Sequence, residues 1–370
     1  MIYLDSAATS FLKPKSVKYA MVDALERMSS PGRGAYSSAM LAAEKVFECR
    51  ENAAKLFNVS APENIVFTFN ATHALNIAIR SLVKAGDKVV ISGYEHNSVT
   101  RVLKHIGADT VIAASPLFDP QSATDAFAEK LDGADACICN HVSNVFGYIL
   151  PIEDIAALCR QREIPLIIDA SQSAGLISLD AETLGAAFAA MPGHKGLFGP
   201  QGTGILICSG DTEPILCGGT GSASMEQQMP EFLPDRLEAG THNVPGIAGL
   251  NAGIEFVLET GAENILAYER ALCAQMAERL ADSGYEVFYS DNGSQAGVLS
   301  VRHMSYDPET MCALLGEKGI SARCGLHCSP LAHMTAGTVE TGTVRFSFSP
   351  FISHGQIETV CKQLEKLIIS

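Results

Sequence analysis

Clusters of lysine and arginine are missing from this chain of 370 residues, which carries 26 basic and 41 acidic side chains and a formal net charge of −15. Proteins that bind nucleic acid neutralise phosphates with grouped basic residues. Long apolar runs are missing too, because no stretch reaches the roughly 18 residues that a membrane-spanning helix requires. We therefore expect neither nucleic acid nor a membrane as a partner.

The cysteines lack the regular spacing of a disulfide framework. There are eleven, an odd number scattered along the chain, and this usage is typical of a reducing compartment. The N-terminus also lacks the basic segment and apolar run of a secretion signal, so we expect a cytoplasmic protein. Cys137 with Cys139, or Cys324 with Cys328, has ligand-like spacing, but no second pair completes a tetrahedral site. We expect no metal.

Short apolar runs separated by helical patterns occupy the first two thirds of the chain. The pattern predicts strands at 65–69, 88–92, 110–114, 136–140, 165–170 and 204–208. It predicts a helix over 72–84 that ends before Gly86, and another that opens at Pro151 with acidic residues in its first turn. Strands that alternate with helices at this spacing indicate βαβ units, so we expect an α/β fold with a mostly parallel sheet.

After about Pro245 the pattern changes to that of an α+β unit. It predicts helices at 247–260, 263–282, 308–318 and 356–369, and strands at 285–289, 297–303 and 343–348. We therefore expect two domains. The large α/β domain covers residues 13–250, and the smaller α+β domain combines residues 1–12 with 251–370.

A lysine among glycines is the most informative feature of the chain. Lys195 lies in Met-Pro-Gly-His-Lys-Gly-Leu-Phe-Gly-Pro-Gln-Gly-Thr-Gly (residues 191–204), where glycines allow close backbone approach. Such a lysine can hold an aldehyde cofactor as a Schiff base. Asp169 ends an apolar strand, where side chains face the ligand crevice of an α/β sheet and a carboxylate can keep a pyridine nitrogen protonated. The alternative for Asp169 is a turn cap.

Thr72 follows the first predicted strand at the start of a helix. Unpaired backbone N–H groups and the helix dipole favour a phosphate there, although a threonine can also serve as an ordinary N-cap. His194, next to the lysine, offers a further phosphate contact.

Taken together, the chain resembles the fold-type I pyridoxal-phosphate enzymes of the class V aminotransferase group and, within it, the cysteine desulfurase and selenocysteine lyase family. The resemblance covers almost the whole chain and implies a mostly parallel seven-stranded sheet in the large domain. It rests on ordered motifs: Tyr3-Leu-Asp-Ser-Ala-Ala-Thr9, Thr72 with Asn76, Glu95-His96, Ser143-Asn-Val145, Asp169-Ala-Ser-Gln172, Gly193-His-Lys195, Glu238-Ala-Gly-Thr241 with Asn243, Arg323 to Cys328, and Val344-Arg-Phe-Ser347.

The resemblance implies pyridoxal 5'-phosphate as cofactor. Lys195 resembles the Schiff-base lysine, Asp169 the partner of the pyridine nitrogen, and Gln172 the donor to the ring hydroxyl. His96 resembles the histidine that stacks on the ring and relays protons. The other positions that match cofactor contacts are Ala71, Thr72, Asn144, His194 and Thr241. Thr241 matches a contact made across the subunit interface, which implies a homodimer.

The resemblance also implies a small amino acid as substrate. Asn144, Arg323 and Arg345 match groups that hold it, since a guanidinium binds a carboxylate bidentately; Arg345 as a surface residue at a strand edge is the alternative. Cys328 matches the cysteine of the Suf-type branch, which takes sulfur from L-cysteine as a persulfide and leaves L-alanine. His327 and Arg323 are expected to favour its thiolate form.

Three positions depart from the family pattern. Pro192 stands where the family usually places serine, so one phosphate contact is lost. Phe-Asn-Ala precedes Thr72 in place of a glycine and threonine, which predicts a different phosphate cup. Cys324 is an extra thiol four residues before Cys328; it can resolve a persulfide, form a regulatory disulfide or simply pack.

Alternative functions remain open at this level. The enzyme can act as a selenocysteine lyase that releases selenium, or as a class V aminotransferase that acts on another small amino acid. A non-catalytic sulfur carrier or redox sensor that uses Cys324 and Cys328 is a third hypothesis, and it predicts that Lys195 is dispensable. A desulfurase or lyase would also pass its sulfur or selenium to an acceptor protein.

Overall fold

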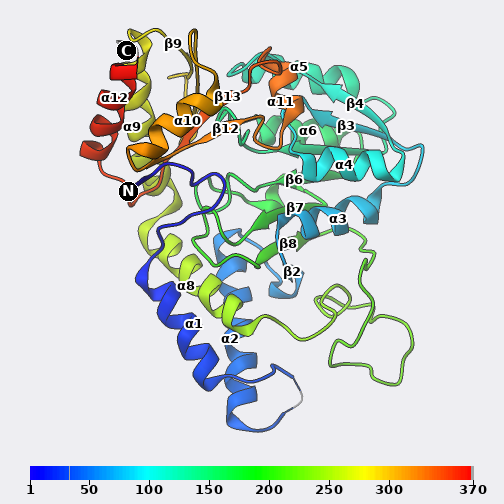
Figure 1. The fold of residues 1–370 in the computed structure, drawn as a ribbon. Helices are drawn as coiled ribbons and strands as arrows, with labels where there is room; N and C mark the ends of the chain where they lie inside the picture. The colour runs from blue at the N-terminus through cyan, green and yellow to red at the C-terminus, as the bar shows by residue number, and fades with distance from the viewer. Residues whose placement is uncertain (33, 368–370) are drawn as a thin grey trace.

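Seven strands form the central sheet of the computed structural model, which describes residues 1–32 and 34–367 (Figure 1). The strand order is β2-β8-β7-β6-β5-β3-β4. The strands are β2 (Ile65–Thr68), β3 (Lys88–Ser92), β4 (Asp109–Ala113), β5 (Ala136–Asn140), β6 (Leu166–Asp169), β7 (Phe188–Pro192) and β8 (Gly204–Cys208). Strand β8 runs antiparallel to β2 and β7, and the other pairs are parallel. The predicted α/β class and the mostly parallel seven-stranded sheet are confirmed.

Alternate side chains of each central strand enter different cores, because successive strand residues point to opposite faces. Ile138 and Ile167 pack with α3 (Ala71–Leu82) and α4 (Asn97–Ile106). Cys139 and Ile168 enter the other core. The helices that contribute to this core include α2 (Ser37–Leu56), α5 (Pro120–Lys130), α6 (Ile152–Gln161), the short α7 (Ala181–Leu184) and α8 (Val244–Thr260). The sheet is therefore covered on both faces.

The sequence patterns did not predict one strand of this sheet. Residues 188–192 form β7, which lies between β6 and β8 at the centre of the sheet. Its sequence, Phe-Ala-Ala-Met-Pro, has no alternation of polar and apolar residues and leads directly into the glycine-rich segment, so the pattern predicted no strand there. Pro192 is tolerated because it is the last residue of the strand.

A second, antiparallel sheet has the order β12-β13-β10-β9. Its strands are β9 (Tyr285–Phe288), β10 (Val298–His303), β12 (Arg323–Gly325) and β13 (Thr343–Ser347), while β1 (Ile2–Tyr3) pairs in parallel with β11 (Ile320–Ser321). Helices α9 (Ala262–Ala281), α10 (Pro308–Glu317), α11 (Pro330–Thr335) and α12 (His354–Leu367) belong to the same part of the chain. Leu4 packs in a core with residues of α9, β10 and β13, so the first residues join the C-terminal third. The domain boundary at residue 250 stays a prediction, since α8 passes through it unbroken.

Helix α1 (Lys15–Arg27) packs with α2 and α8 at one end of the molecule, and a 3₁₀ turn at Pro62–Asn64 precedes β2 (Figure 1). Residues 209–243 contain no helix or strand and extend away from the sheet at the lower right of the figure. None of the helices in the described ranges is long and apolar enough to cross a membrane.

Candidate active site

A cavity of about 200 Å³ gathers nearly all of the predicted site residues. It lies where β5 and β6 end, which is where α/β sheets bind ligands. The predicted residues that line it are Ala71, Thr72, His96, Asn144, Asp169, Gln172, His194, Lys195, Arg323, Cys328 and Arg345. Thr241 does not line this cavity; it lies in a separate pocket with Phe69, His73 and Asn243.

Lys195 follows β7 in a tight turn that presents its amine to the cavity. Gly196 is required there, because a Cβ at this position would lie 2.4 Å from the carbonyl oxygen of Ala174. Burial lowers the pKa of Lys195 to about 8, and the nearby carboxylate of Asp169 opposes this effect. The lysine has no hydrogen-bond partner among the described residues. Near neutral pH the protonated amine therefore still predominates, but a far larger fraction of it is the reactive neutral amine than in an ordinary lysine with a pKa of 10.5.

Asp169 is the last residue of β6 and is buried. Its Oδ1 accepts a hydrogen bond from the backbone N–H of Ser171 at 2.9 Å. Oδ2 has no partner in the described part of the chain and remains available to a donor in the cavity. The alternative role of Asp169 as a turn cap therefore applies to Oδ1 and not to Oδ2.

The first turn of α3 forms one end of the cavity. Asn70 is the N-cap residue, since its side chain accepts a hydrogen bond from the N–H of His73 at 2.9 Å. Thr72 is therefore not the cap, and its hydroxyl lies 3.0 Å from that of Ser98. The first N–H groups of a helix lack partners within the helix, so Ala71 and Thr72 offer donors to an anion.

His96 caps α4 and faces the same cavity. Its Nδ1 accepts a hydrogen bond from the N–H of Ser98 at 3.0 Å, which places the proton of the neutral ring on Nε2. Burial lowers the pKa of His96 to about 4; Asp169 raises it and Lys195 lowers it further. The imidazole is therefore neutral at pH 7. The sequence analysis did not predict Ser98 as a site residue, because no motif marks it.

Glu95, which precedes His96 in the chain, is buried and bonded to Asn140, which lines the cavity. The Oε1 atom of Glu95 accepts hydrogen bonds from the N–H of Asn140 at 2.7 Å and from the hydroxyl of Ser92 at 2.6 Å. Oε2 is buried and has no partner among the described residues. Burial raises the pKa of Glu95 to about 8, so this carboxyl is largely neutral at pH 7.

The N-terminal segment forms a wall of the site. Gln172 donates from Nε2 to the carbonyl of Ala7 at 3.0 Å, and His194 Nδ1 lies 3.0 Å from Thr9 Oγ1. The N–H of Ser10 donates to the carbonyl of His194 at 2.8 Å. The first ten residues thus orient side chains that follow them by more than 160 positions.

Arg345 is buried in β13, at the centre of the second sheet, so the alternative of a surface residue at a strand edge is excluded. Its Nη2 lies 2.7 Å from Asp5 Oδ1, and its Nη1 donates to the carbonyl of Asn144 at 2.8 Å. The remaining nitrogen, Nε, is buried without a partner among the described residues.

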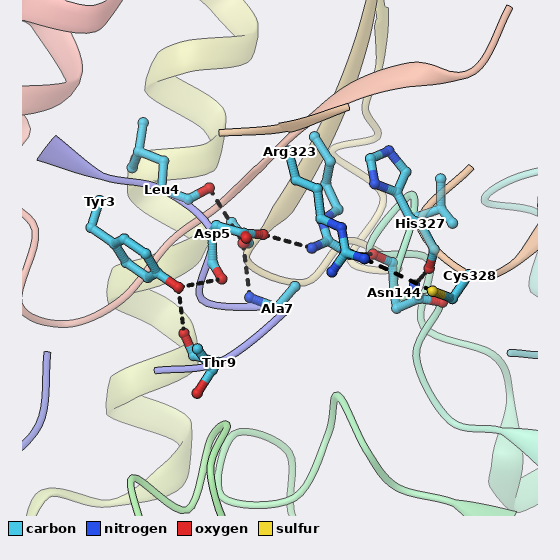
Figure 2. A network of polar contacts seen from close by, with 12 residues as sticks. Tyr3, Leu4, Asp5, Ala7, Thr9, Asn144, Arg323, His327 and Cys328 are labelled. Carbon is cyan, nitrogen blue, oxygen red and sulfur yellow. Dashed lines mark hydrogen bonds and ion pairs between the residues drawn. The ribbon is translucent and has the colours of Figure 1, made fainter. Parts of the chain in front are cut away.

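Cys328 is exposed and stands on a turn with unusual backbone geometry. His327 and Cys328 have φ angles of 50° and 59°, a region that non-glycine residues rarely adopt and that often marks functional sites. Nη2 of Arg323 lies 3.8 Å from the Cys328 sulfur (Figure 2). The side chain of Asn144 supports this turn, because it donates to the carbonyl of His327 at 2.9 Å and accepts from the hydroxyl of Ser329 at 2.6 Å.

The expected role of His327 beside the thiol is wrong. Its ring is buried and bonds through Nε2 to Thr343 at 3.1 and 3.2 Å. Burial and the positive charge of Arg345 hold its pKa well below the usual range, so it carries no charge near Cys328. Adjacency along the chain misled the prediction, because successive side chains of this turn point in different directions.

With this geometry, the sequence comparisons define the class of protein. The family model for class-V aminotransferases matches residues 2–360, and the chain belongs to that family of pyridoxal-phosphate enzymes. It is 32% identical to a probable cysteine desulfurase of Methanothermobacter thermautotrophicus over 99% of this chain and 94% of the relative. It is 33% identical to one of Pyrococcus abyssi over 100% and 95%. The apo structure of a cysteine desulfurase from Thermococcus onnurineus superposes with a TM-score of 0.91 at 30% identity, over 100% of this chain and 94% of that one.

Proposed function

We propose that this enzyme is a pyridoxal-phosphate-dependent cysteine desulfurase of the Suf-type branch, which converts L-cysteine to L-alanine and carries the sulfur on Cys328. One observation supports this most directly. The lysine amine and an exposed cysteine thiol line the same cavity, and Arg323 lies 3.8 Å from the thiol sulfur. An aminotransferase needs the lysine but has no use for the thiol.

The residues present fit pyridoxal 5'-phosphate. Ala71 and Thr72 at the first turn of α3 suit its phosphate, and the free Oδ2 of Asp169 suits its pyridinium N–H. Lys195 supplies the amine for the aldehyde, while Gln172 and His96 lie in the same cavity. When bound, the cofactor supplies an electron sink for the negative charge that develops at the substrate Cα.

The substrate carboxylate requires a cation inside the cavity. Arg345 offers Nε, its one nitrogen without a partner in the described ranges, while Asp5 and Asn144 each bind one of its other two nitrogens. Arg323 flanks the same space next to the thiol. We assign carboxylate binding to these two arginines and a supporting role to Asn144, whose side-chain amide is already bonded to Ser329 and His327.

Proton transfer and sulfur transfer fall to different residues. The neutral Lys195 amine takes the proton from the substrate Cα. The Cys328 thiolate attacks the substrate sulfur, so that an S–S bond forms as the C–S bond breaks. The Cα proton returns from Lys195. Two thiol protons remain, one from Cys328 and one from the substrate. One of them becomes the third methyl hydrogen of alanine, and the other becomes the proton of the persulfide. Cysteine plus the Cys328 thiol thus give alanine plus the Cys328 persulfide.

We further propose a homodimer in the cytoplasm that hands its persulfide sulfur to an acceptor protein. Large apolar side chains are exposed on α1 and on the extended segment 209–243: Tyr19, Val22, Leu25, Leu216, Met225 and Phe232. Such surfaces usually meet a partner, and Thr241 lies at the end of the same segment. The odd number of cysteines supports a reducing compartment.

Alanine release from the cofactor-loaded protein tests this function. L-cysteine and L-selenocysteine are compared in the presence of reductant for the unmodified chain, Cys328→Ala and Lys195→Ala. We expect turnover of cysteine that is abolished in both variants. Turnover of selenocysteine alone that survives in Cys328→Ala would identify a selenocysteine lyase. A pyridoxamine product formed with a keto acid would identify an aminotransferase.

A further inference from the structure

Cys324 has a thiol partner, and that partner is not Cys328. The thiol of Cys324 adds to the effect of burial in raising the pKa of the Cys312 thiol on α10, so the two thiols lie within interaction range. Both residues are partly exposed, in contrast to most of the cysteines of the chain. The two are twelve positions apart, and nothing in the local sequence pairs them.

Strand alternation places this thiol pair on the face of β12 opposite to the active site. Arg323 lines the cavity and is the register partner of Arg345, which lines it too. Cys324 is the register partner of Val344, which is buried in the small core where Cys312 packs. Because successive side chains of a strand point to opposite faces, Cys324 faces α10 while Arg323 faces the substrate.

Helix α10 lies directly over β12. The two elements pack together, as α10 also does with the neighbouring strands β11 and β13. The contact between Cys312 and Cys324 is therefore part of a continuous helix–strand interface.

We propose that Cys312 and Cys324 are a redox-active dithiol whose disulfide ties α10 to β12 and thereby restrains Arg323 and the turn that carries Cys328. A small-molecule disulfide is the oxidant. One thiolate attacks it to form a mixed disulfide and releases one thiol; the second protein thiol then attacks the protein-bound sulfur and releases the other. Two protein thiols and one disulfide thus become one protein disulfide and two free thiols.

A second pair of contacting thiols provides an internal control. The thiols of Cys137 on β5 and Cys159 on α6 also interact and shift each other's pKa, but both are buried in the large core. Thiol exchange requires access. We therefore expect oxidised glutathione to link Cys312 with Cys324 and to leave Cys137 and Cys159 reduced.

The test is peptide mapping of the cofactor-loaded protein after incubation in glutathione redox buffers. Trypsin places Cys312 on peptide 303–318 and Cys324 on peptide 324–345, which also carries Cys328. The Cys328→Ala variant makes the second peptide unambiguous. We expect the cross-linked peptide pair in the wild type and in Cys328→Ala, and its loss in Cys312→Ser and in Cys324→Ser. A link between Cys324 and Cys328 would overturn the proposal, as would glutathione on Cys328 with no link to Cys312.

The effect on the active site is measured by alanine release, and this part rests on the proposed function. Small displacements of positioning groups cost up to 100-fold in rate, so we expect the cross-link to slow turnover by roughly tenfold and dithiothreitol to restore it. The double variant Cys312→Ser/Cys324→Ser controls for oxidation of Cys328, because inhibition shared by both proteins comes from Cys328. If oxidation inhibits the wild type and the double variant equally, the disulfide between Cys312 and Cys324 does not act on Arg323, and this part of the proposal is overturned. Absence of turnover in both reduced proteins would instead count against the desulfurase function and leave the peptide map as the test of the dithiol.

Discussion

The guanidinium of Arg345 lies 2.7 Å from the carboxylate of Asp5, so the fifth residue of the chain pairs with a buried cation 340 positions later. The arginine side chain is 1% exposed and the aspartate 20%. The pair also joins the N-terminal segment to β13, and that segment in turn contacts Gln172 and His194. Asp5 thus positions the arginine that we propose as a ligand of the substrate carboxylate.

Replacing Asp5 with asparagine leaves the Arg345 charge without its counter-ion. Removing one member of a buried ion pair is strongly destabilising, so we expect a loss on the order of 3 kcal/mol in the free energy of unfolding, measured by urea denaturation. We also expect KM for cysteine to rise more than kcat falls. The matched control is Asp23→Asn, which breaks an exposed ion pair to Arg27 of similar length, 2.9 Å; such pairs contribute about 0 to 1 kcal/mol. Equal effects of both variants would contradict this role.

The amine of Lys195 is expected to titrate near pH 8 in the cofactor-free protein. The pH dependence of its modification by an amine reagent, followed by mass spectrometry of its peptide, measures this. Because the carboxylate of Asp169 raises the pKa of Lys195, Asp169→Asn should move the midpoint to lower pH, while the exposed carboxylate change Asp132→Asn should leave it in place. A midpoint at the ordinary value of 10.5 would show that the amine is not desolvated.

Glu95 should make the protein less stable as the pH rises. Its pKa is raised from 4.5 to about 8 in the folded state, so the folded state holds a proton that the unfolded chain releases. Its contribution to stability is full below pH 4.5 and is lost as the pH rises to about 8. Each pKa unit corresponds to about 1.4 kcal/mol.

Glu95→Gln should therefore flatten part of this decline in the free energy of unfolding. The part of the decline that remains should come from Glu269, another buried carboxyl, since burial raises its pKa as well. The change Glu129→Gln at the surface is the control and should leave the slope unchanged. A slope that is the same in all three proteins would show that Glu95 is ionised in the folded state.

The hydroxyl of Ser329 should hold the Cys328 turn in place through Asn144. Ser329→Ala leaves the buried Oδ1 of Asn144 without its 2.6 Å partner, a loss that costs about 1 to 3 kcal/mol. We expect kcat to fall several-fold and the alkylation rate of Cys328 to change. Ser283→Ala removes an exposed hydroxyl that bonds only to a helix carbonyl and should change neither. Unaltered alkylation in Ser329→Ala would remove Asn144 and Ser329 from the support of this turn.

Local periodicity accounts for what the sequence predicted well. Strands β3, β5 and β8 have the predicted bounds, because each is a short apolar run bounded by turn or helix signals. Strand β7 was missed because its pairing partners, β6 and β8, and not its own pattern, make it a strand. The bounds of the small domain remain a prediction, as do the roles of the individual site residues.

The sequence by itself determined the kinds of chemistry available: a lysine between glycines, an aspartate at a strand end, and a cysteine between turn residues. Ordered motifs along the chain also sufficed to identify the family. Only the tertiary structure decided which side chains meet. Asp5 pairs with Arg345, Asn70 rather than Thr72 caps α3, His327 turns toward Thr343, and Cys324 contacts Cys312. The physical reason is that hydrogen bonds and thiol contacts act over a few ångströms in space, and folding brings those atoms together regardless of their separation along the chain.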